Sequence, residues 1–149
     1  MDIFGLPLHP LVVHAVVVIV PLAALGALLL VAVPRLRAAY GWLTVAFAVV
    51  GAISAVVARV SGTALAADLH LTTSSLIARH MALGTWTPLP AGVLAIAVAG
   101  LVWSAGRPPD KRNKTLVGVF AAITVVAAIA SLVMVGLTGH AGASAVWGS

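Results

Sequence analysis

Histidine is the residue type in this sequence best suited to bind a metal or a cofactor. The chain has five histidines and no cysteine, so thiolate sites and iron–sulfur clusters held by cysteine are excluded. His9 and His14 stand at the start of the first apolar run, His80 opens the third run, and His140 follows the fourth within Thr138-Gly139-His140-Ala141-Gly142. Imidazole is therefore the strong soft-donor ligand that remains.

The elements that must position these side chains are membrane-spanning helices. The sequence is 62% apolar and 7% charged, and its mean hydropathy is +1.20, far above the usual values for soluble domains. Four runs are long enough to cross about 30 Å of hydrocarbon, and they cover residues 11–33, 42–60, 82–103 and 116–137. We expect an integral, multi-pass membrane protein.

The basic residues predict the orientation of these spans. Six of the eight Lys and Arg fall in the two loops that join span one to span two and span three to span four. The positive-inside rule places those loops in the cytoplasm and both termini outside it. The formal charge of +5 is thus a sign of orientation, and we expect no nucleic-acid partner.

The fold class predicted is all-α, an up-down-up-down bundle of four transmembrane helices forming one domain over residues 1–149. Small residues at four-residue spacing, such as Gly51 and Ala55, allow helices to pack closely. Residues 61–81 are too polar to span and predict a short extracytoplasmic helical cap, in which a helix starts at 72–74 and runs through Leu76 and His80 into the third span. Pro21, Pro88 and Pro90 predict kinks. We find no internal repeat.

In such a bundle all five histidines, with Arg59 and Arg79, lie in the extracytoplasmic half, so His9, His14, His80 and His140 form one layer. We expect this layer to bind haem b for electron transfer between the quinone pool and an extracytoplasmic redox partner. His14 and His80, from diagonal helices, would be the axial ligands, with His140 as the substitute for either. Arg59 and Arg79 would bind the propionates, and Ala58 and Gly84 would leave room for the macrocycle.

Two other interpretations stay open at this stage. His14, His80 and His140 would hold zinc or copper if they approached tetrahedral spacing, although the sequence has no metal-binding motif. In the other, the protein is a non-catalytic membrane subunit or a homo-oligomer whose histidines are structural or sense pH. His9 would then cap the first span, His14 would bond a carbonyl freed at a kink, His70 would be solvated and Arg79 would snorkel. The sequence shows no general base, nucleophile or phosphate-binding loop, so we do not expect a stand-alone enzyme.

Two motifs resemble one bacterial membrane family. Gly5-Leu6-Pro7-Leu8-His9-Pro10-Leu11-Val12-Val13-His14 and Thr138-Gly139-His140-Ala141-Gly142 are similar to the family catalogued as domain of unknown function 2231, as are Gly62 and the histidine that opens the third span. The resemblance implies a four-span protein of the bacterial inner membrane and supplies no established activity. It supports treating His9, His14, His80 and His140 as a set. The chain departs from many members after Ser144, where they continue with a tyrosine and further glycines.

Overall fold

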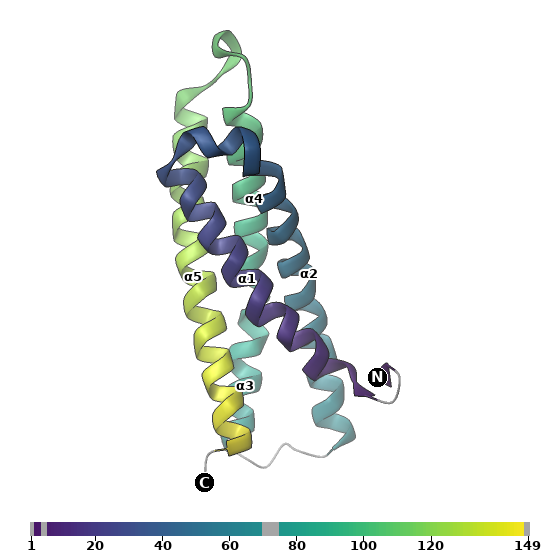
Figure 1. Cartoon of the computed structure of the whole chain (residues 1–149). Helices are drawn as coiled ribbons and strands as arrows, with labels where there is room; N and C mark the ends of the chain where they lie inside the picture. Colours follow the sequence, from purple (N-terminus) through teal and green to yellow (C-terminus); the bar gives the residue numbers. More distant parts are fainter. Residues whose placement is uncertain (1, 4–5, 70–74, 148–149) are drawn as a thin grey trace.

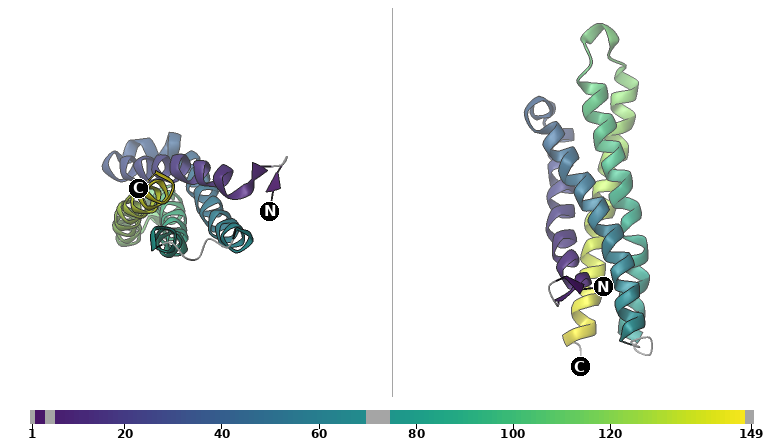
Figure 2. Two further views of the ribbon diagram at one scale, coloured as in Figure 1. Left: turned by 90° about the horizontal axis from the view of Figure 1, so that it is seen from below. Right: turned by 90° about the vertical axis from the view of Figure 1, so that its right-hand side faces the viewer.

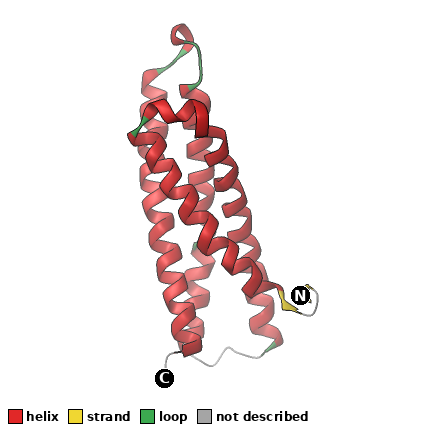
Figure 3. Ribbon diagram, in the orientation of Figure 1, coloured by secondary structure: helices red, strands yellow, loops and turns green. Residues whose placement is uncertain are grey.

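The computed structural model consists of long helices that run side by side (Figures 1 and 3). It describes residues 2–3, 6–69 and 75–147. The helices are α1 (Leu8–Ala32), α2 (Arg37–Asp68), α3 (Ser75–Trp86), α4 (Pro88–Ala105) and α5 (Lys114–Trp147). Two 3-10 turns, η1 (Pro34–Leu36) and η2 (Pro109–Lys111), join helices, and β1 (Asp2–Ile3) pairs antiparallel with β2 (Leu6–Pro7).

Four helical stretches are long and apolar enough to cross a membrane, namely Leu8–Ala32, Pro34–Asp68, Ser75–Ala105 and Lys114–Trp147. The all-α prediction is therefore confirmed. Many large apolar side chains point away from the bundle, including Leu25, Ile53 and Val126, as expected of a surface solvated by hydrocarbon. Three of the four stretches extend several residues beyond the spans predicted from hydropathy.

The helices form a ring in which α1 packs against α2 and α5, and α4 packs against the same two helices. Helices α1 and α4 barely touch, so the first and third spans are diagonal, as predicted. The starts of α1 and α3 and the ends of α2 and α5 lie at one end of the bundle, which we call the histidine end because it also holds His9 and His80 (Figures 1 and 2). The α4–α5 hairpin reaches further than the α1–α2 hairpin at the opposite end (Figure 2).

Small side chains hold the helices together. Ala24, Ala27 and Ala128 are fully buried, and Gly51 and Ala55 of the predicted close-packing pair are both buried on α2. A Cβ at Gly51 would lie 3.0 Å from Val20 Cγ2, so α1 approaches α2 to a separation that leaves no room for a side chain there. This is the packing that small-residue spacing predicts when lipid offers no competing hydrophobic gain.

Polar side chains close the turns at the opposite end. Arg37 donates from Nε to the Leu30 carbonyl over 2.8 Å, satisfying one of the last carbonyls of α1. Asn113 Oδ1 accepts from the Leu116 amide at the start of α5, which is an N-cap bond. These contacts fix two helical hairpins, α1–α2 and α4–α5.

The helix expected to run through Leu76 and His80 into the third span is present as α3, and the rest of the cap takes a form that hydropathy does not indicate. Residues 61–68 continue α2, and residues 75–81 belong to α3, which leads into α4, so the cap consists of extensions of the spans. The third span is interrupted at Thr87, since Pro88 and Pro90 lack the amide protons that would continue the ladder of α3, whereas α1 continues through Pro21. His70 and the predicted helix start at 72–74 lie outside the described residues.

Candidate functional site

A cavity of about 580 Å³ opens at the histidine end. Its wall is formed by residues of α1, α2, α3 and α5. At this end α1 leans away from α5 (Figure 1). His9, His14, His80 and Arg59 line it, as do Ala58 and Gly84, the two small residues expected to leave space. Most of the remaining wall is aliphatic, so the cavity combines an apolar interior with a few polar groups, as ligand sites do.

His9 begins α1 but is held by α2. Its Nδ1 donates to the Ala58 carbonyl over 2.9 Å, and Ser61 Oγ donates to the same carbonyl over 3.2 Å. The ring lies against Gly62, where an added Cβ would stand 2.7 Å from His9 Cε1. His9 therefore bridges two helices instead of capping the first span, which corrects the structural interpretation of this residue.

His80, on α3, is held by α5 in the same way. Its Nδ1 donates to the Thr138 carbonyl over 3.0 Å, and its ring lies against Gly142, where a Cβ would be 3.0 Å from both Cε1 and Nδ1. Thr138 is itself fixed by a 3.0 Å hydrogen bond between its hydroxyl and that of Thr87. The contact ties the segment before α4 to α5.

The two histidines share one local design. Each imidazole donates to the carbonyl of residue i on a neighbouring helix and lies on a glycine at i+4, since Gly62 follows Ala58 and Gly142 follows Thr138 by four residues. A carbonyl only accepts, so Nδ1 carries the proton of the neutral ring and Nε2 keeps a lone pair. Metal-ligating histidines are commonly oriented by such a bond from the other ring nitrogen.

The His9 and His80 rings are close neighbours. Their centroids are 6.2 Å apart with an interplanar angle of 76°. His14 is on the same cavity wall but is exposed, and its Nδ1 donates to the Pro10 carbonyl of its own helix over 2.6 Å. This agrees with a carbonyl-bonded His14, although the carbonyl is not the one that Pro21 frees. Geometry thus pairs His80 with His9, whereas the sequence favoured His14.

The structure separates two predicted site residues from the others. His140 and Arg79 are exposed, and neither lines the cavity. In Thr138-Gly139-His140-Ala141-Gly142, the carbonyl of Thr138 accepts a hydrogen bond from His80, and the absence of a side chain at Gly142 leaves space for its ring. The imidazole of His140 itself does not line the cavity. Sequence reasoning missed Gly142 and the Thr138 carbonyl because the motif drew attention to its own histidine.

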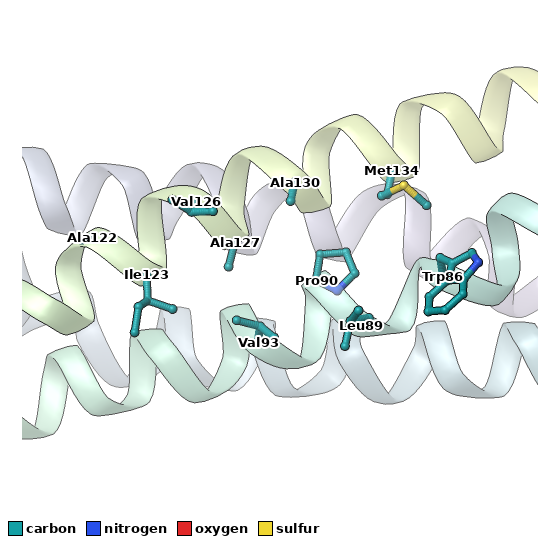
Figure 4. A pocket seen from close by; sticks show the side chains of 10 residues that line it. All are labelled: Trp86, Leu89, Pro90, Val93, Ala122, Ile123, Val126, Ala127, Ala130 and Met134. Atoms are coloured by element: carbon teal, nitrogen blue, oxygen red, sulfur yellow. The ribbon is translucent and has the colours of Figure 1, made fainter.

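A metal site made of three protein ligands does not form in the described part of the chain. No group of three or more His, Asp or Glu side chains comes together there, so the expected zinc or copper set of His14, His80 and His140 is not assembled. A second hollow, also of about 580 Å³, runs along the α4–α5 face and has only apolar side chains on its wall (Figure 4). Trp86, Pro90 and Met134 lie there, and the indole N–H of Trp86 is the only hydrogen-bond donor among the lining side chains.

These features define a polytopic α-helical membrane protein whose described residues form a largely apolar cavity, with a few polar groups, at the histidine end. The chain belongs to the family described as "Predicted membrane protein (DUF2231)", whose model matches residues 5–149. No curated protein and no solved structure matches the chain. The family description agrees with the four apolar helices and names no role for the cavity.

Proposed function

We propose that this protein holds haem b between His9 and His80 and transfers electrons within the bacterial inner membrane. The observation that supports it is the pair of carbonyl-anchored imidazoles with centroids 6.2 Å apart. Two imidazoles on opposite sides of one metal ion have centroids about 6 Å apart, because each metal–nitrogen bond is about 2 Å and the ring centre lies about 1 Å beyond the nitrogen. The observed separation of the centroids fits this requirement when both Nε2 atoms face the point between the rings.

The cavity fits the rest of the group. Its volume of about 580 Å³ lies within the roughly 300–1,000 Å³ of cofactor and ligand sites. Ala58 and Gly84 leave space at the wall for a macrocycle. Arg59 supplies a guanidinium that would pair with a carboxylate, whereas Arg79, outside the cavity wall, is left as an interfacial side chain.

Each protein group has a stated role in this proposal. His9 and His80 would bind through Nε2 and are held in orientation by the carbonyls of Ala58 and Thr138. The aliphatic wall excludes water, and Arg59 neutralises an acidic edge. When bound, haem supplies a one-electron redox couple, which suits exchange between the quinone pool and an extracytoplasmic partner. The orientation, with both termini outside, follows from the basic loops.

A difference spectrum tests the proposal. We expect wild-type protein, purified in mild detergent from haem-replete cells, to give the sharp α-band of a six-coordinate b-type haem on reduction. His9→Ala and His80→Ala should each abolish six-coordination, while His140→Ala serves as the matched control and should keep it. A flat wild-type spectrum with haem available, or full retention in both cavity variants, would overturn the assignment.

A second function, that of a non-catalytic membrane subunit, is favoured by one observation. The bonds from His9 to α2 and from His80 to α5 join helices without any ligand, so both rings can act as structural links. Co-purification with a larger complex and no chromophore would support this function. In that case His9→Ala and His80→Ala would lower stability and leave no spectroscopic change to measure.

A further inference from the structure

The two halves of the bundle repeat one structure, although the sequence shows no repeat. A shift of 71 residues, which relates His9 to His80, places all six buried residues of α1 on buried residues of α4 and the Thr87 before it. The six are Val16, Val20, Ala23, Ala24, Ala27 and Leu30, and their counterparts are Thr87, Ala91, Leu94, Ala95, Val98 and Leu101. Few of these pairs are identical, so a comparison of residue letters does not find them.

Helices α2 and α5 follow the same rule with a shift of 80 residues, which relates Ala58 to Thr138 and Gly62 to Gly142. Every residue from 51 to 60 has the same degree of burial as its counterpart from 131 to 140. The packing has the matching symmetry, since α1 contacts α2 and α5 while α4 contacts α5 and α2. The α1–α2 hairpin and the α3–α4–α5 hairpin are thus related by a pseudo-two-fold axis along the bundle, as in other parallel-repeat membrane folds.

The cavity lies on this axis. Nearly every residue of its wall from one half has its counterpart on the wall from the other half. His9 pairs with His80, and each is held by an equivalent carbonyl and an equivalent glycine. Their 6.2 Å separation therefore spans the axis. A ligand placed there meets the same chemistry from both sides.

The symmetry is broken at four polar positions of the wall whose counterparts also line it, and of these Thr87 corresponds to Val16 and Thr138 to Ala58. The counterpart of Arg59 is Gly139, and that of His14 is Thr85, and all four residues line the cavity. The first hairpin alone thus provides a cation. Thr85 bonds the carbonyl four residues before it, as His14 does, so these two positions keep the same geometry with different chemistry.

We infer that the site binds a two-faced ligand on the pseudo-two-fold axis, a metal macrocycle coordinated equally by His9 and His80, and that Arg59 turns its carboxylate edge toward the first hairpin. The inference rests on the proposed haem function and adds how the ligand is oriented in the cavity, which Arg59 determines. It implies that position 139 is an equivalent carboxylate site that lacks only its side chain. A Cβ at Gly139 has nothing within 4 Å, so a larger residue is accommodated there.

Moving the arginine across the axis tests the inference. We expect Arg59→Gly to weaken haem affinity about tenfold, the usual size for a lost charge-assisted bond. The double variant Arg59→Gly/Gly139→Arg should recover affinity to within about threefold of wild type. The matched control is Arg59→Gly/His140→Arg, which places the same charge on the next residue of α5 but outside the cavity wall, and it should not recover.

The outcomes separate the two proposals. Haem binding by the wild-type protein with no recovery in the Gly139 variant, or equal recovery in the His140 control, would overturn the pseudo-symmetric site and leave the haem assignment standing. An unequal effect of His9→Ala and His80→Ala on six-coordination would also overturn it. Failure of the wild-type protein to bind ferric haem in titration would overturn both.

Discussion

Alanine at Gly62 should destabilise the protein, although glycine-to-alanine changes within helices usually stabilise. The added Cβ would lie 2.7 Å from His9 Cε1 and 3.0 Å from Nδ1, well inside the 3.5–4.0 Å of a normal contact. The ring must move, and its bond to the Ala58 carbonyl is then lost. Overpacking costs about 1–3 kcal/mol, and the lost hydrogen bond costs about 0.5–1.5 kcal/mol.

Helix propensity offsets part of this, because alanine is favoured over glycine by about 1 kcal/mol. The net expectation for Gly62→Ala is a loss of about 0.5–3.5 kcal/mol in the free energy of unfolding. Gly139→Ala is the matched control, since its Cβ meets nothing within 4 Å, and it should gain up to about 1 kcal/mol. Equilibrium unfolding in detergent micelles measures both. The same sign and size for the two variants would refute the role assigned to Gly62.

Three further predictions concern the frame around the cavity. Thr87→Val and Thr138→Val should each lower the free energy of unfolding by about 1 kcal/mol. Because both remove the same 3.0 Å hydrogen bond, the double variant should lose clearly less than the sum of the two. Additive losses would contradict this shared bond. Arg37→Ala should lower the free energy of unfolding by about 1 kcal/mol, because the bond to the Leu30 carbonyl is lost, and unchanged stability would show that this contact is not needed. A reporter fused at either terminus should read extracytoplasmic and one in residues 106–113 cytoplasmic, with the reverse pattern overturning the orientation.

Periodicity and composition were sufficient to predict the four spans, their close packing and their order around the bundle. Hydropathy located four spans, small residues such as Gly51 and Ala55 indicated the close packing, and chain order implied that the first and third spans are diagonal. Each of these depends on local properties of the sequence. The extension of α2 over residues 61–68 was missed because its polarity ended the hydropathy signal before the helix ended, whereas the helix through Leu76 and His80 into the third span was predicted.

The candidate site was only partly predictable, for a physical reason. Which imidazole faces the cavity depends on the rotation of its helix and on which carbonyl its Nδ1 reaches. His9 was underrated because a position before proline resembles a cap, and His140 was overrated because glycines surround it. Gly142, the second glycine after Thr138, leaves space on α5 for the ring of His80, which belongs to α3. The two residues are far apart in the sequence. The repeat was hidden because equivalent positions in the two halves are buried alike but are mostly occupied by different residue types.

Electron paramagnetic resonance of the ferric, haem-loaded protein tests the central claim most directly. Because the His9 and His80 ring planes meet at 76°, the account predicts a strongly anisotropic low-spin signal, as nearly perpendicular axial imidazoles give. Substituting either histidine should convert it to a high-spin signal. A high-spin signal from the wild-type protein, or no protein-bound haem signal when haem is supplied, would contradict the claim that these two imidazoles share one iron.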